Sequence, residues 1–146
     1  MIVFLDMDDV LCDFKSAHQK ALIDNPDIKY PQSQYGFFTN LKPLEGAIEA
    51  AKALESSAQY RPYILTAPSI KNPLCYTEKR VWVEKHLGFF FVKRLIICPD
   101  KSLLKGQYLI DDNAAGKGQD GFEGELIHFG NDLFPNWEAV RNYLSF

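Results

Sequence analysis

Five short apolar segments of strand type recur along this chain and alternate with helical patterns. The strand-type segments are residues 2–5, 62–65, 94–97, 108–110 and 125–129. Apolar residues recur at three- and four-residue steps over 43–56 and 75–87, and Asn136 is a suitable N-cap for a last helix. Strands that alternate with helices indicate an α/β fold with a doubly wound, mainly parallel sheet that is covered on both faces.

Residues 14–42 interrupt this alternation. The segment begins with a helical pattern and then becomes irregular, with two prolines and the aromatic side chains of Tyr35, Phe37 and Phe38. Because it is inserted after the first strand, it would overhang the carboxyl end of the sheet. We therefore expect a single domain of residues 1–146 with a small cap at 14–42.

The bulk composition excludes several classes of protein. A length of 146 residues fits one domain, and a net charge of −3 gives no electrostatic footprint for duplex nucleic acid or an anionic membrane. No apolar run reaches membrane-spanning length, and the N-terminus lacks the basic region of a signal peptide. The three cysteines form no Cys-x-x-Cys pair, which argues against a disulfide scaffold or a zinc site. We expect a cytoplasmic protein.

Polar side chains follow four of the five predicted strands. They are Asp6 and Asp8 after the first strand, Thr66 after the second, Lys101 after the third, and Asp111 with Asp112 after the fourth. In a parallel sheet the carboxyl ends of these strands meet at one edge, where open α/β sheets bind ligands. Two carboxylates as close as Asp6 and Asp8 repel each other unless a cation or a shared proton compensates, so this edge is a predicted site.

This set of groups suits the hydrolysis of a phosphate ester. Mg²⁺ prefers a few hard carboxylate oxygens and shares its coordination with substrate phosphate. One carboxylate can attack phosphorus and form an aspartyl phosphate, while a second protonates the leaving oxygen and later activates water. A lysine and a hydroxyl can hold the nonbridging oxygens, where charge is stabilised during phosphoryl transfer.

Each signal also has an ordinary structural explanation. An isolated Asp-x-Asp is commonly a solvated turn or a helix cap, Thr66 alone is a normal strand-end residue, and Asp111 with Asp112 could cap a following helix. Lys105 competes with Lys101, because a lysine near a strand end is usually a surface residue. The order of the four signals along the chain favours the functional interpretation, and the Asp-Lys-Ser context favours Lys101 over Lys105.

With these motifs the chain resembles the haloacid dehalogenase superfamily of phosphohydrolases, and within it most closely the 5'(3')-deoxyribonucleotidases. The similarity lies in five blocks of sequence that follow the family's order. They are residues 6–14 (Asp-Met-Asp-Asp-Val-Leu-Cys-Asp-Phe), 43–47 (Pro-Leu-Glu-Gly-Ala), 64–68 (Ile-Leu-Thr-Ala-Pro), 78–85 (Glu-Lys-Arg-Val-Trp-Val-Glu-Lys) and 109–113 (Leu-Ile-Asp-Asp-Asn). The resemblance implies a Rossmann-type fold and a phosphohydrolase activity.

The resemblance also implies roles for the carboxylates. Asp6 would be the nucleophile and a Mg²⁺ ligand. Asp8 would be the general acid and base, and its backbone carbonyl would be a further ligand of the metal. Asp111 and Asp112 would complete the metal site, one directly and the other through water, and the resemblance leaves open which does which.

The same resemblance implies that residues after the second and third strands bind the phosphoryl group of the substrate. Thr66, with Ala67 beside it, would bind that group. Lys101 would stabilise it together with the charge of the nucleophile. The substrate implied is a small phosphorylated molecule, with a nucleoside monophosphate as the leading choice.

Two departures from the family pattern bear on the site. Asp9 stands where the family usually has glycine, so either the turn is formed differently or a further carboxylate enters the site. The cap is also much shorter than in the deoxyribonucleotidases, whose base pocket is built from cap aromatics. Phe14, Tyr35, Phe37 and Phe38 are the candidates for a reduced pocket, and they could equally form the cap's own core.

The predicted function is Mg²⁺-dependent hydrolysis of a phosphomonoester through an aspartyl phosphate, with a nucleoside or deoxynucleoside monophosphate as substrate. A small cap leaves the site open, so the alternative is a larger or different ester: a polynucleotide end, a phosphoprotein or a sugar phosphate. A non-catalytic metal- or phosphate-binding module is the alternative from another class. Loss of Asp6 or Asp8 would favour it, and both are present. A homodimer in which a second subunit covers an apolar edge is a further option.

Overall fold

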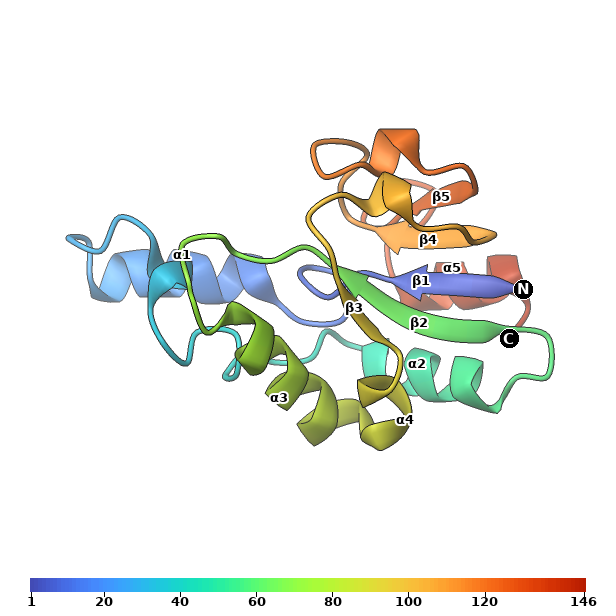
Figure 1. Ribbon diagram of the computed structural model, residues 1–146, viewed down its shortest axis with the longest axis horizontal. Helices are drawn as coiled ribbons and strands as arrows, with labels where there is room; N and C mark the ends of the chain where they lie inside the picture. Colours follow the sequence, from blue (N-terminus) through green and yellow to red (C-terminus); the bar gives the residue numbers. More distant parts are fainter.

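The computed structural model covers residues 1–146 and contains one five-stranded sheet (Figure 1). Its strands are β1 (Ile2–Leu5), β2 (Arg61–Thr66), β3 (Leu95–Ile97), β4 (Tyr108–Asp111) and β5 (Glu125–His128). Their order in the sheet is β3-β2-β1-β4-β5, and every neighbouring pair is parallel. The predicted α/β fold with a parallel, Rossmann-type sheet is confirmed.

Helices and single 3₁₀ turns connect the strands. They are α1 (Phe14–Asp24), η1 (Pro31–Ser33), α2 (Ala47–Ser56), α3 (Cys75–Leu87), α4 (Phe89–Val92), η2 (Lys101–Leu103), η3 (Gln119–Gly121) and α5 (Trp137–Leu144). None of the helices combines the length and the apolar character that a membrane crossing requires.

The two faces of the sheet are covered differently. Successive side chains of a strand point to opposite faces, so Val3 and Leu5 join the 25-residue core that α2, α3 and α5 complete. Phe4, between them, points to the other face and packs with Leu65, Leu109 and Phe122 in a cluster of only four buried residues. The second face was expected to carry helices. It carries short connections instead, because the segments after β3 and β4 contain only η2 and η3.

The helix expected over 43–56 begins later than predicted, at Ala47. Residues 43–46 are held by the turn that follows β1, since the N–H of Leu44 donates to the carbonyl of Leu11 at 2.9 Å. Gly46 then reverses the chain with a left-handed φ of 74°, a conformation that glycine adopts at little cost. The other two helices match their predictions, and the side chain of Asn136 accepts from the N–H of Ala139 at 3.0 Å.

The cap segment, residues 14–42, projects from the carboxyl ends of the strands (Figure 1). It consists of α1, η1 and irregular chain. Helix α1 has no buried residue, so it contributes little to the core. The cap is anchored instead by its last part, where Phe38 and Leu41 are buried in the main core.

Candidate active site

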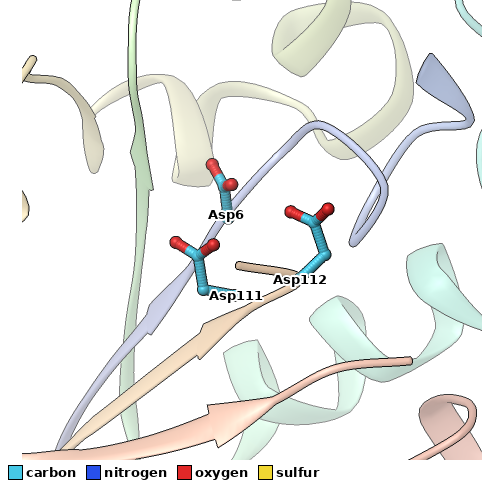
Figure 2. Close-up of side chains that lie close together, drawn as sticks. All are labelled: Asp6, Asp111 and Asp112. Carbon is cyan, nitrogen blue, oxygen red and sulfur yellow. The ribbon is translucent and has the colours of Figure 1, made fainter. Parts of the chain in front are cut away.

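Three carboxylates meet at the edge of the sheet where the strand order reverses. Asp6 follows β1, Asp111 ends β4 and Asp112 comes next, and each offers an oxygen within 4.8 Å of the others. Figure 2 shows the three side chains projecting in the same direction beyond the strand ends. Because β1 and β4 are neighbours, this position is the topological switch point at which α/β sheets bind ligands.

Lys101 adds an ammonium group to this cluster. Its side chain is fully buried, with Nζ 3.0 Å from Oδ1 of Asp6 and in an ion pair with Asp111. Lys105, the alternative to Lys101 as the lysine of the predicted site, lies at the surface with 85% of its side chain exposed. The structure therefore brings Lys101, and not Lys105, to the carboxylates.

The carboxylate cluster carries more negative charge than its buried position favours. Burial, followed by the charges of Asp6 and Asp111, raises the pKa of Asp112 from 3.8 to about 6. Burial and the charge of Asp6 also raise the pKa of Asp111, although Lys101 opposes this. A divalent cation would relieve this repulsion, and hard carboxylate oxygens are the ligands that Mg²⁺ prefers. The donor set therefore fits a magnesium ion.

Lys79 forms a second polar centre that the sequence did not single out. Its ammonium group, fully buried, donates to Oδ2 of Asp8 at 2.9 Å, to Oγ1 of Thr66 at 2.7 Å and to the carbonyl of Ala67 at 2.8 Å. The structure thus brings Asp8, Thr66 and Ala67 together around one lysine from α3. A signal was available: Lys79 lies in the buried stripe of α3, three residues before Trp82, where an unpaired lysine would be costly.

Asp9 forms the turn that glycine forms in the family pattern. Its φ of 57° lies in the left-handed region, and its Oδ1 accepts the N–H of Lys15 at 2.9 Å. This bond satisfies a free amide in the first turn of α1, which offsets part of the backbone strain. Asp9 does not belong to the three-carboxylate cluster. Instead, Lys15 extends over the site, with Nζ 3.7 Å from Oδ2 of Asp112.

Three of the four cap aromatics pack together. The ring of Phe14 lies 5.5 Å from that of Phe37 and 6.1 Å from that of Phe38, and Phe38 is only 1% exposed. Tyr35 lies apart from this cluster, 70% exposed. Tyr35 and Phe37 also line a cavity of about 580 Å³ between α1 and residues 31–42, which none of the catalytic candidates lines. Phe38 thus belongs to the main core, and Phe14 and Phe37 pack against that core, partly buried.

The raised pKa of Asp112 predicts how the stability of the metal-free protein depends on pH. Between pH 4 and 6 the folded chain retains a proton on Asp112 that the unfolded chain has released, so stability falls as pH rises through this range. We expect thermal unfolding in EDTA to show this fall in the wild type and a smaller fall in Asp112→Asn. The exposed Asp132→Asn should keep the wild-type slope, and equal slopes in all three proteins would contradict the prediction.

The fold and the motifs after its strands define a haloacid dehalogenase-type α/β domain. A family profile described as "5' nucleotidase, deoxy (Pyrimidine), cytosolic type C protein" matches residues 27–134. A protein of Vibrio phage KVP40 that carries a 5'(3')-deoxyribonucleotidase name is 42% identical over 99% of this chain and 84% of its own length. The human cytosolic-type 5'(3')-deoxyribonucleotidase is 31% identical over 94% of this chain and 77% of its own length.

The chain therefore belongs to the 5'(3')-deoxyribonucleotidase family of phosphoric monoester hydrolases. This membership confirms the resemblance and favours an enzyme over a non-catalytic binding module. The human mitochondrial 5'(3')-deoxyribonucleotidase is also similar, at 31% identity over 94% of this chain and 68% of its own length.

Proposed function

We propose that this enzyme is a Mg²⁺-dependent 5'(3')-deoxyribonucleotidase that hydrolyses deoxynucleoside monophosphates through an aspartyl phosphate on Asp6. The observation that carries the proposal is the position of Asp6, at the switch point beside two further carboxylates and 3.0 Å from Lys101. The substrate class is supported by the names of the relatives.

Asp112 is the freer of the two aspartates after β4 to act as a direct metal ligand, because its own side-chain partners are exposed: Nδ2 of Asn113 lies 2.8 Å from Oδ1 and Nζ of Lys15 lies 3.7 Å from Oδ2. Asp111 is occupied by three donors: Lys101 on Oδ2, and the backbone N–H of Asn113 and Nε2 of Gln119 on Oδ1, at 2.9 and 3.1 Å. We therefore assign the metal to Asp6 and Asp112, with the backbone carbonyl of Asp8 as a further ligand and Asp111 holding Lys101 in place. When bound, Mg²⁺ would orient the phosphoryl group and offset its charge.

The proposed reaction has two displacements at phosphorus. In the first, a carboxylate oxygen of Asp6 bonds to phosphorus, the ester P–O bond breaks, and Asp8 donates its proton to the leaving oxygen. In the second, water attacks phosphorus, Asp8 takes back a proton, and the bond between Asp6 and phosphorus breaks to release phosphate. Thr66 and Lys101 hold the nonbridging oxygens during both steps.

A substrate panel with control of the metal tests this function. Deoxynucleoside 5'- and 3'-monophosphates should be hydrolysed with higher kcat/KM than ribonucleotides, sugar phosphates, phosphopeptides or 5'-phosphorylated oligonucleotides. EDTA should abolish phosphate release, and added Mg²⁺ should restore it. A preference for one of the other esters would overturn the substrate class, and full activity in EDTA would overturn the role of the metal.

We also infer that the enzyme works in the cytoplasm. Cys12, Cys75 and Cys98 are all free thiols, which fits a reducing compartment. One relative is named as a cytosolic type, whereas two others are named as mitochondrial. Fractionation of cells that express the tagged chain would test the inference, and recovery in an organelle would contradict it.

A further inference from the structure

Glu78 is a buried carboxylate that the proposed reaction does not use. It lies in the first turn of α3 with only 5% of its surface exposed, and it forms no ion pair. Three neutral donors surround it. The backbone N–H of Gly36 binds Oε1 at 2.6 Å, while the backbone N–H of Phe38 and Nδ2 of Asn72 bind Oε2 at 3.1 and 3.2 Å. Two of these three donors belong to the cap.

An anion in this position is costly unless donors such as these satisfy it. Hydrogen bonds to an ionised carboxylate are also stronger than those between neutral groups. Asn72, itself 2% exposed, extends the same connection, because its Nδ2 also donates to the carbonyl of Gln34 at 3.4 Å. Glu78 and Asn72 therefore tie residues 34–38 of the cap to the start of α3.

The same helical turn also holds the catalytic candidate Lys79. Glu78 faces the cap, whereas Lys79 contacts Asp8 and Thr66. Phe38 contacts both residues: its N–H donates to Glu78, and its ring centre lies 5.0 Å from Nζ of Lys79. A cap that shifted at Gly36 and Phe38 would remove this ring from the amine, but the three hydrogen bonds of the amine would remain, because their acceptors lie outside the cap.

We propose that Glu78 is a positioning residue that docks the cap over the catalytic edge, and that substrates large enough to reach the cap depend on it. This inference rests on the proposed function, because it takes the nucleoside of a nucleotide to be the part that extends toward the cap. A small phosphate ester reacts at the same carboxylates without reaching the cap. Its turnover is therefore independent of Glu78.

Glu78→Gln tests the proposal, because the amide keeps the size of the side chain but turns one acceptor into a donor that faces other donors. Misplacement of a binding element can cost about 10²-fold, so we expect kcat/KM for a deoxynucleoside monophosphate to fall about 10- to 100-fold, mainly through KM. For p-nitrophenyl phosphate the change should stay within about 3-fold, since no cap contact is lost. Glu84→Gln, in the same helix but partly exposed beside Arg80, should behave as wild type.

Hydrogen exchange provides a readout of docking that does not need turnover. The amides of Gly36 and Phe38 should exchange faster in Glu78→Gln and at the wild-type rate in Glu84→Gln. Unchanged exchange would overturn the docking role. Equal loss of activity on both esters would overturn the effect on substrate choice.

A milder variant covers the case in which Glu78→Gln does not fold. Asn72→Ala removes one donor to Glu78 and should give the same pattern with smaller changes. If it leaves both the exchange of Phe38 and the KM for the nucleotide unchanged, the proposal fails. A wild-type enzyme that hydrolyses p-nitrophenyl phosphate but no nucleotide would instead overturn the proposed substrate, while the exchange data would still decide the docking.

Discussion

Replacing Asp6 by asparagine is expected to lower phosphate release by at least about 10³-fold, because an amide cannot serve as the nucleophile. The substitution preserves the size of the side chain and leaves the ion pair between Lys101 and Asp111 in place. It removes one of three mutually repelling charges but also the ion pair of Asp6 with Lys101, and because these effects oppose each other the stability of the metal-free variant should stay close to that of the wild type. The measurements are kcat at saturating Mg²⁺ and the unfolding midpoint in EDTA.

The covalent step can be tested separately from the loss of activity. Acid quench during turnover followed by borohydride reduction should convert the aspartyl phosphate at position 6 into homoserine, which mass spectrometry of the peptide detects. Asp132→Asn, an exposed aspartate that does not belong to the carboxylate cluster, is the matched control and should retain both the activity and the label. Homoserine at any other aspartate, or an active Asp6→Asn, would refute the assignment of the nucleophile.

The positions of Asp6, Thr66 and Asp111 could be predicted from the sequence because of the sheet topology. Parallel strands bring their carboxyl ends to one edge, so residues that follow the strands converge whatever the details of packing. Lys101 reaches the same edge for the same reason, because it follows the short strand β3. Its competitor Lys105 is four residues further along and points to solvent, a distinction that depended on the motif rather than on periodicity.

Residues on helices were harder to predict than residues at strand ends. Lys79 and Glu78 are adjacent in α3, yet Lys79 donates to Asp8 at the edge of the sheet and Glu78 accepts from the cap. Their roles depend on which elements pack on either side of α3, and the sequence of a single helix does not contain that information. The sequence block did match the family, but the match alone assigned no contact to either residue.

The remaining differences also arise from long-range partners. Pro43 and Leu44 continue the helical pattern locally, but Leu44 pairs with the carbonyl of Leu11, so the helix starts only after Gly46. The second face of the sheet, which was expected to carry helices, also differs from the prediction. The connections after β3 and β4 contain only η2 and η3 and no α-helix, and Phe122 packs on this face instead.

Lys79→Met is expected to lower kcat/KM for a deoxynucleotide by about 10²- to 10³-fold, because one buried ammonium group serves both the acid and the phosphate-binding hydroxyl. Burial lowers the pKa of Lys79, but the charges of Asp8 and Asp6 outweigh burial and raise this pKa above its ordinary value, so the group is a cation at neutral pH. An arriving phosphoryl dianion competes with Asp8 for this cation. Asp8 can then take up the proton that it must donate to the leaving oxygen.

The stability of the same variant separates this role from a purely structural one. Thr66 and Ala67 lose a donor, whereas Asp8 keeps 24% of its side chain exposed to water, so the loss should be about 1–3 kcal/mol in denaturant unfolding. Lys85→Met, exposed in the same helix, is the control and should change neither activity nor stability.

A double-mutant cycle between Lys79 and Asp8 gives the sharper result. If the lysine acts through the acid, Lys79→Met should cost much less activity when Asp8 is already asparagine than it does in the wild type. Lys79→Arg should not restore activity, because three acceptors converge on one compact ammonium group and a planar guanidinium does not match that arrangement. Additive losses in the cycle would mean that Lys79 acts on the phosphate alone, and a fully active Lys79→Met would exclude it from the site.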